Sequence, residues 1–262
     1  MKKMFFLITF CLPIFLLAQN EEGTIIYNEK MSLKIELPDD MKQHAKNIPS
    51  GSASKMQLTF NANESFYKVV PKPEEAPEAN EMQSGRVVKL MGANQNSLIY
   101  YNRTEGKKLE SKNFFGKQFL ITSTPEEGKW KVTGEQKIIA GYNCLSAEMT
   151  EENPKKEGEM KTTKAWFTPE IPQSIGPGEF QGLPGAILEV TFKQKSLEIT
   201  IEAEKVTFEK LEKAIEKPSD GKKVTQQEFE EITEKKMKEM TKLYGGKSKG
   251  DRDGKRIRII TN

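Results

Sequence analysis

Few side chains in this sequence are of the types that catalyse reactions or bind metal ions. The chain of 262 residues contains one histidine, His44, and two cysteines, Cys11 and Cys144. A Cys/His zinc cluster or a disulfide-dense scaffold needs more of these residues. His44 lies in a polar segment, and no serine or cysteine around it forms a recognisable nucleophile motif. The sequence therefore predicts no catalytic triad and no metal site.

Short matches to known motifs occur near the C-terminus, where their surroundings do not support them. Gly246–Gly250 matches the G-x-S-x-G pattern of serine hydrolases, but that pattern requires a strand before the serine and a helix after it. The same segment resembles the end of a phosphate-binding loop, but Thr241 occupies the position of the first glycine. We predict no catalytic residue and no cofactor. An enzyme whose site is built from scattered carboxylates and aromatic side chains stays open as an alternative.

The N-terminus has the pattern of a secretory signal peptide. A short basic stretch precedes the apolar run Met4–Ala18, which is too short to span a membrane. These features predict a signal peptide at residues 1–18 and export to the periplasm, the outer membrane or the medium, without a transmembrane anchor. Cleavage there removes Cys11 and leaves Cys144, whose apolar neighbours favour burial over a free reactive thiol.

The charge distribution argues against nucleic-acid binding. The formal net charge is only +3, although charged residues make up 30% of the chain. A dedicated nucleic-acid-binding protein has a strongly basic face. Residues 245–262 contain six basic and two acidic residues. We predict a basic tail there, which either touches an acidic surface or is a disordered, soluble end.

Most of the chain has the two-residue periodicity of β-strands. Alternation is clearest over residues 186–192 and 197–203, where apolar side chains share one face and Glu198 and Glu202 share the other face of the second strand. One face must meet a core and the other water, as in antiparallel sheets. We predict a mostly β fold in one domain, residues 19–244: an antiparallel, strongly curved, half-barrel-like sheet.

The periodicity changes near the C-terminus, where residues 225–244 predict an α-helix. Thr225 and Glu228 form a capping box, and Gly245 is a natural stop. One sector of a helical wheel contains the apolar residues Phe229, Ile232, Met240, Leu243 and Tyr244, with Met237 at its edge. We expect this stripe to pack on the curved sheet, with docking of a partner as the alternative.

The segment Thr168–Gly185 is unusually rich in proline and glycine, which account for eight of its 18 residues. Such a loop is rigid at its prolines and allows positive φ at its glycines, and long irregular loops are often functional. The candidate binding residues are Trp166, Phe180, Gly182, Leu183, Pro184 and Gly185. The alternative is a structural crossover in which Ile175, Phe180 and Leu183 plug one end of the sheet.

Phe180–Val190, with the sequence FQGLPGAILEV, resembles the signature of the GLPGLI family of exported bacterial envelope proteins. Ala186 stands where the name-giving motif has leucine. The segments 130–132, 139–144 and 165–172 (WKV, IAGYNC and AWFTPEIP) also resemble the family. The resemblance implies an exported envelope protein with a strand-rich pattern similar to curved half-barrels that carry lipid or lipoprotein acyl chains. It implies no settled activity and no catalytic residues.

Together, these observations predict a non-enzymatic envelope protein that binds a protein partner or an apolar ligand through the concave face of the sheet or the Thr168–Gly185 loop. A purely structural partner of an outer-membrane assembly is a further alternative. An apolar cavity would favour ligand binding, and a polar cleft with convergent carboxylates would favour an enzyme. A flat exposed apolar patch would favour a protein partner.

Overall fold

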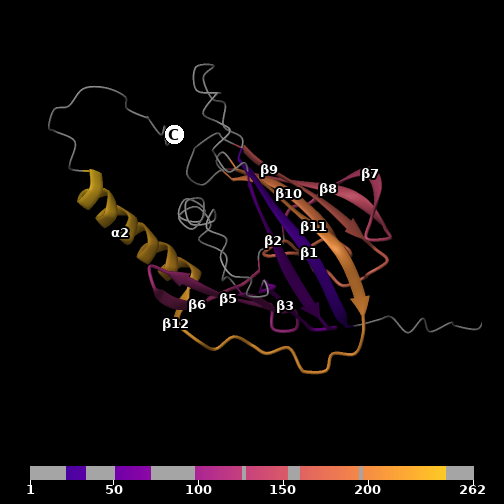
Figure 1. Cartoon of the computed structure of the whole chain (residues 1–262), viewed down its shortest axis with the longest axis horizontal. Coiled ribbons are helices and arrows are strands. Elements are labelled where there is room, and N and C mark those ends of the chain that lie inside the picture. Colours follow the sequence, from indigo (N-terminus) through magenta and orange to yellow (C-terminus); the bar gives the residue numbers. More distant parts are fainter. Residues whose placement is uncertain are drawn as a thin grey trace, which may run out of the picture.

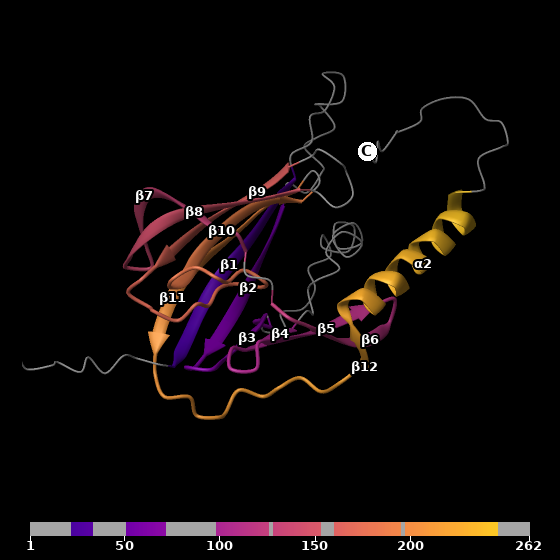
Figure 2. The ribbon, with the colours of Figure 1, turned by 180° about the vertical axis from the view of Figure 1, so that it is seen from behind.

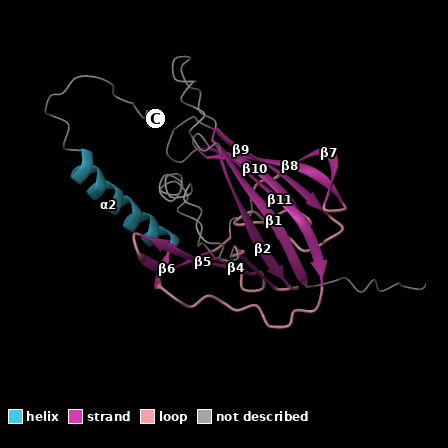
Figure 3. Ribbon diagram, in the orientation of Figure 1, coloured by secondary structure: helices cyan, strands magenta, loops and turns pink. Residues whose placement is uncertain are grey.

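The computed structural model describes residues 22–33, 51–71, 98–125, 128–152, 160–194 and 197–245. The first six strands are β1 (Gly23–Leu33), β2 (Gly51–Phe60), β3 (Glu64–Val69), β4 (Leu98–Asn102), β5 (Lys107–Phe114) and β6 (Lys117–Ser123). The remaining elements are β7 (Lys131–Ile139), β8 (Tyr142–Glu152), β9 (Met160–Thr168), β10 (Ala186–Gln194), β11 (Leu197–Phe208), β12 (Lys222–Thr225) and the helix α2 (Gln226–Gly245) (Figures 1 and 3). The predicted signal peptide and residues 246–262 of the predicted tail lie outside the described residues.

All twelve strands belong to one sheet, in the order β12-β6-β5-β4-β3-β2-β1-β11-β10-β9-β8-β7. Every neighbouring pair is antiparallel except β12 and β6, which are parallel. Two meanders, β1–β6 and β7–β11, are joined where β1 pairs with β11. The outer strands β12 and β7 are not paired with each other, so the sheet is not closed. The predicted mostly β, antiparallel fold is confirmed.

The register of the strands shows which side chains share a face, because directly opposite residues of antiparallel strands lie on the same side. One row across the sheet contains Ile25, Leu58, Tyr67 and Ile99. A second row contains Glu29, Ile201, Val190, Ala165 and Ala147. Ile25 and Glu29 are both on β1, four residues apart, so the two rows lie on one face. That face is apolar apart from a few side chains.

This apolar face is the inside of a strong curve. Tyr101 of β4 donates a hydrogen bond from its hydroxyl to the carbonyl oxygen of Glu179, in the loop that precedes β10, at 3.3 Å. In the strand order, β4 and β10 are five strand spacings apart. In a flat sheet that separation would be about 24 Å. Figures 1 and 2 show that the sheet bends around its apolar face, which we call the concave face, and the loop reaches across the inside of this bend.

The helix α2 starts against one end of the concave face. The backbone N–H of Thr225 donates to Glu228 Oε2 at 2.7 Å, and the backbone N–H of Glu228 donates to Thr225 Oγ1 at 3.2 Å, which is the predicted capping box. The ring of Phe229 packs on Phe119, with centroids 5.3 Å apart. Met237 is 53% exposed. The predicted packing therefore holds for the first turns of α2, and the rest of the helix extends away from the sheet (Figure 2).

Candidate functional site

The proline- and glycine-rich segment links β9 to β10 and folds back over the concave face. Thr168, the last residue of β9, is paired with Ala186, the first residue of β10. The backbone N–H of Ala186 donates to the carbonyl oxygen of Ile171 at 2.9 Å. The backbone N–H of Ile187 donates to the carbonyl oxygen of Ile175 at 2.8 Å. These bonds tie the loop to the first residues of β10.

Side chains of this loop fill the part of the curve that lies beside β8, β9 and β10. Ile175, Phe180 and Leu183 are all buried. Phe180 and Leu183 belong to a cluster with Val190 and other residues of β8, β9 and β10. Trp130 also ties the loop down, because its indole N–H donates to the carbonyl oxygen of Gln181 at 2.8 Å. This packing matches the alternative in which the loop is a structural plug.

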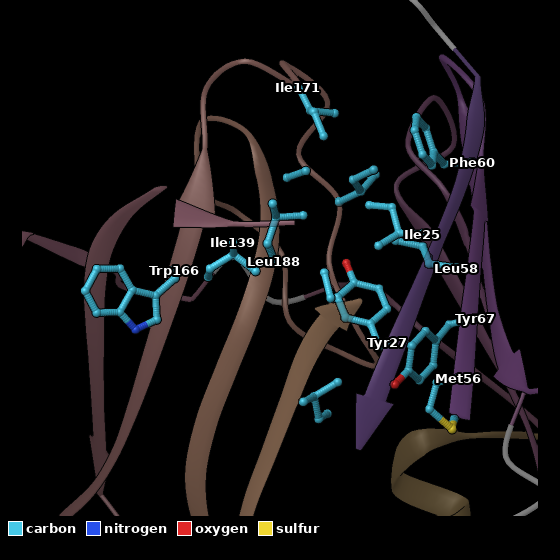
Figure 4. Close-up of a cluster of buried hydrophobic side chains, with 14 of the residues drawn as sticks. Ile25, Tyr27, Met56, Leu58, Phe60, Tyr67, Ile139, Trp166, Ile171 and Leu188 are labelled. Carbon is cyan, nitrogen blue, oxygen red and sulfur yellow. The ribbon is translucent and has the colours of Figure 1, made fainter. Parts of the chain in front are cut away.

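The six candidate binding residues do not form one surface. Five of them come from the loop: Phe180, Leu183 and Gly185 are buried, whereas Gly182 and Pro184 are exposed. Trp166 lies on the convex face, because the preceding residue, Ala165, faces inward and successive side chains of a strand alternate. Figure 4 shows Trp166 at the far side of the buried cluster from Tyr27 and Tyr67. A ligand on the concave face cannot contact all six residues, and their binding role stays a prediction.

The ring of Trp166 is enclosed by charged side chains that already have partners. The ammonium groups of Lys137 and Lys164 lie 4.5 and 5.0 Å from its ring centroid. Lys137 also forms an ion pair with Glu189 at 2.5 Å, and Lys164 forms one with Glu135 at 2.5 Å. Because Lys137 is on β7 and Glu189 is on β10, this cluster holds the edge strand β7 over the convex face.

Cys144 is buried, as the sequence predicted, and it is a free cysteine. Burial raises the pKa of its thiol to about 11. A thiol is nucleophilic only as the thiolate. Burial therefore disfavours the thiolate form of Cys144 at neutral pH.

One polar side chain on the concave face, Tyr67, lacks the hydrogen-bond partner that buried polar groups normally have, and the partly buried Glu29 lies on the same face. Tyr67 is 4% exposed, and its hydroxyl has no hydrogen-bond partner. Burial also raises the pKa of Glu29, and no charge among the described residues offsets this effect. The pKa of Tyr67 is raised by burial and further by the negative charge of Glu29. Most buried polar groups in proteins are hydrogen-bonded, and such exceptions call for an explanation.

The neighbouring Tyr27, unlike Tyr67, has a hydrogen-bonded hydroxyl. Its ring packs edge-on against Tyr67, with centroids 6.2 Å apart, as Figure 4 shows. Its hydroxyl donates a hydrogen bond to the carbonyl oxygen of Ile187 at 2.7 Å. Burial raises its pKa far above the ordinary value. Of two adjacent buried tyrosines, one is anchored to β10 and the other has an unused hydroxyl.

The sequence analysis did not single out Glu29 or Tyr67. A signal was present, because Ile25, Tyr27, Glu29 and Met31 occupy alternate positions of one strand and only Glu29 is charged. A carboxylate in the inward phase of an amphipathic strand is unusual. Tyr67 gave no comparable signal, since its missing partner depends on packing between strands.

Replacing each tyrosine by phenylalanine distinguishes the contributions of these two hydroxyls to the free energy of unfolding. We expect Tyr27→Phe to lower the free energy of unfolding by about 1 to 3 kcal/mol, because it leaves a buried carbonyl without its donor. Tyr67→Phe should instead raise it by about 1 kcal/mol or more, because it removes a buried hydroxyl that has no partner. Urea denaturation of both variants measures the difference. Equal losses would mean that the hydroxyl of Tyr67 has a partner.

A separate polar cleft of about 840 Å³ lies at the end of the sheet, where the β2–β3 and β4–β5 turns meet the end of β11. Its lining includes the carboxylates of Glu22, Glu64 and Glu209. Glu64 accepts a hydrogen bond from the hydroxyl of Tyr100. Burial, together with this hydrogen bond, raises the pKa of Tyr100 to about 12. Within the described ranges, no three histidine, cysteine or acidic residues are placed to hold a metal ion.

Comparison with known proteins gives a fold and no activity. The model of a protein family of unknown function, Porph_ging, matches residues 151–189. This segment contains β9, the loop and the start of β10. The match fits a GLPGLI-type family loosely, and the GLPGLI-like motif at residues 182–187 stays a prediction. No curated protein sequence is significantly similar to the chain.

Among solved structures, the chain is similar to PNGF-II in its C2 crystal form, with a TM-score of 0.50 and 12% identity over 81% of this chain and 33% of that chain. The chain thus spans about a third of the length of PNGF-II. The lipoprotein LppX of Mycobacterium tuberculosis matches with a TM-score of 0.30 and 9% identity over 72% of this chain and 87% of that chain. The likeness to PNGF-II concerns the fold alone.

No helix in the described part of the chain is both long and apolar enough to cross a membrane.

Proposed function

We propose that this protein is a non-enzymatic, exported binding module that holds the apolar chain of an amphiphilic ligand inside the concave face of its sheet. The observation that carries the proposal is the unpartnered hydroxyl of Tyr67, which is 4% exposed on the concave face that also contains Glu29. Leaving a buried polar group without a partner costs about 1 to 3 kcal/mol, and more for a charge. A bound polar group would remove that cost.

The surroundings of this pair fit a hydrocarbon chain. Met31, Ile199 and Phe192 form the next row of the concave face, directly beyond Glu29 along β1. These side chains present aliphatic and aromatic carbon. The ring of Phe192 is also contacted by Phe180 of the loop and by the ammonium group of Lys161, each 5.2 Å from its centroid. An amphiphile would place its chain along this row and its polar group at Glu29 and Tyr67.

The polar cleft and the exposed apolar residues give weaker support to the alternatives. In the cleft, Glu64 is already engaged by Tyr100, so its carboxylate has a structural partner. The exposed large apolar side chains of the described residues are divided between two ends of the sheet: Val132, Ile138 and Met160 on one side, and Phe115 and Met237 on the other. This division disfavours a single flat interface with a protein partner.

Isothermal titration of the purified protein with hexylamine, octylamine and decylamine tests the proposal. Each added methylene that is buried should tighten binding about fourfold. Met31→Gln, on the concave face, should weaken decylamine binding several-fold, whereas the matched control Lys30→Gln, on the opposite face of the same strand, should leave it unchanged. Affinity that does not depend on chain length, or equal effects of the two variants, would overturn the proposal.

A further inference from the structure

The C-terminal end of the chain has a concentration of positive charge that the rest of the chain does not share. Residues 235–262 include the part of α2 beyond its first turns and the predicted basic tail. They contain ten lysines and arginines and three acidic residues, a net charge of +7. Because the whole chain has a net charge of +3, residues 1–234 together carry −4. A positive end on an otherwise negative chain attracts an anionic surface.

Beside the start of α2, one aromatic side chain is exposed to solvent in an unfavourable backbone conformation. Phe115 lies at the tip of the β5–β6 hairpin and is 53% exposed. Its φ is +50° and that of Gly116 is +75°, as in a tight hairpin turn. Asparagine, aspartate and glycine are preferred at such a position, and a bulky residue there is strained. The turn itself therefore does not require an aromatic ring, and backbone strain of this kind often marks a functional position.

The hairpin tip and α2 together expose a small apolar and basic projection. The ammonium group of Lys236 lies 5.8 Å from the ring centroid of Phe115, so the helix passes the hairpin tip. The next residue of the helix, Met237, is 53% exposed. Beyond this point α2 continues away from the strands (Figure 1). We call Phe115, Lys236 and Met237 the hairpin–helix patch.

Neither a second copy of the chain nor a large protein interface fits this patch well. Phe229, in the first turns of α2, packs on Phe119 of the sheet, so another copy could pair only with the far half of the helix. In that half, residues 235–245 carry a net charge of +3, and two such halves would repel each other. Two exposed apolar side chains are also fewer than the continuous patch that a protein interface buries.

A lipid surface fits the same features, because it needs no complementary shape. Apolar side chains beside an amphipathic helix enter the boundary between head groups and acyl chains. Clusters of lysine and arginine on or next to such a helix are attracted to anionic lipid. The hairpin–helix patch supplies the first feature, and residues 235–262 supply the second.

We propose that the hairpin–helix patch docks the protein on an anionic lipid surface. Phe115 and Met237 enter the interface, and the basic residues of 235–262 are attracted to the anionic head groups. The patch is separate from the concave face, so this inference does not rest on the proposed binding of an amphiphile there.

Co-sedimentation of the purified protein with vesicles of phosphatidylcholine, with and without about 30% phosphatidylglycerol, tests the proposal. At about 0.1 M salt we expect binding to the anionic vesicles to be about tenfold tighter or more, and raising the salt to about 0.5 M should weaken it several-fold. Replacing both Lys235 and Lys242 by glutamine should weaken it about tenfold, since each basic residue near an anionic membrane contributes a few-fold.

Phe115→Asn distinguishes docking from folding. Asparagine is favoured at positive φ, so this variant should keep or raise the free energy of unfolding while it weakens binding to the anionic vesicles several-fold. Met237→Gln should weaken binding in the same way, because it removes an exposed apolar side chain. The matched control is Ile138→Gln, which changes a side chain that is 72% exposed on β7, at the other end of the strand order. This control should leave vesicle binding unchanged, as should Met31→Gln on the concave face.

Several results would overturn the docking surface. Equal binding to neutral and anionic vesicles, or no binding to either, would do so, as would full binding by both Phe115→Asn and Met237→Gln. Loss of vesicle binding in Met31→Gln but not in Phe115→Asn would place the lipid contact on the concave face instead. A dimer in analytical ultracentrifugation that dissociates in Met237→Gln would show that a second copy, and not lipid, covers the patch.

Discussion

Replacing Gly185 with alanine should lower the free energy of unfolding by about 3 to 5 kcal/mol, because backbone strain and overpacking each contribute about 1 to 3 kcal/mol. Gly185 has a φ of +148°. A Cβ at this position would lie 2.1 Å from the carbonyl oxygen of Thr168 and 3.1 Å from the Cα of Pro169. These are backbone atoms at the junction of β9 and the loop, so they cannot rotate aside as a side chain would. Urea denaturation followed by circular dichroism measures the loss.

Gly178→Ala is the matched control in the same loop. Gly178 also has a positive φ, +63°, but a Cβ there would have no atom within 4 Å. This variant should cost only the left-handed backbone conformation, about 1 to 2 kcal/mol. If both variants lost the same free energy, the close approach of Gly185 to Thr168 would not be what requires glycine.

Strands, turns and helix caps can be predicted from local sequence patterns, because the residues that form them are close together in the chain. Ala140 and Gly141 connect β7 to β8 with φ values of +49° and +88°, as a tight hairpin turn requires. Asn61 forms the turn after β2, where its side-chain oxygen accepts hydrogen bonds from the backbone N–H groups of Asn63 and Glu64. Thr225 and Glu228 cap α2. Each of these features depends on residues at most a few positions apart.

The long-range features could not be predicted in the same way. β1 pairs with β11, which begins more than 160 residues later, and a bulge interrupts this pairing at Ile26 and Tyr27. Periodicity shows that a strand has an inner face, but it does not show which strand lies beside it. The contact of Tyr101 with Glu179 depends on all the intervening pairings and on their accumulated curvature. For this reason the sequence indicated a curved sheet without showing how the loop crosses it.

The candidate site was predicted only in part, for two physical reasons. Composition singled out the loop because proline and glycine mark irregular backbone, but the burial of Phe180 and Leu183 comes from packing against other strands. Trp166 was grouped with them by closeness in sequence, whereas strand alternation places it on the convex face. Glu29 was detectable from alternation, but its importance depends on neighbours that arrive from β2, β3 and β11.

Leu183→Asp should destabilise the protein by about 4 kcal/mol or more, which exceeds the effect of most single substitutions. Leu183 is 2% exposed and packs in the cluster that contains Phe180 and Val190. The substitution removes a buried aliphatic side chain and places a carboxylate among apolar groups without a partner. Leu183→Met, which nearly conserves volume, should cost less than about 1.5 kcal/mol. Urea denaturation monitored by tryptophan fluorescence compares the two variants.

The same pair of variants decides whether the loop itself contacts ligand. If the loop is a plug, Leu183→Met should bind decylamine within about twofold of the unchanged protein, and Leu183→Asp should lose binding only together with its near-ultraviolet circular dichroism. Loss of structure would then explain the loss of binding. A Leu183→Asp variant that kept native circular dichroism and stability but no longer bound decylamine would place the ligand on the loop. That outcome would move the binding site away from Glu29 and Tyr67.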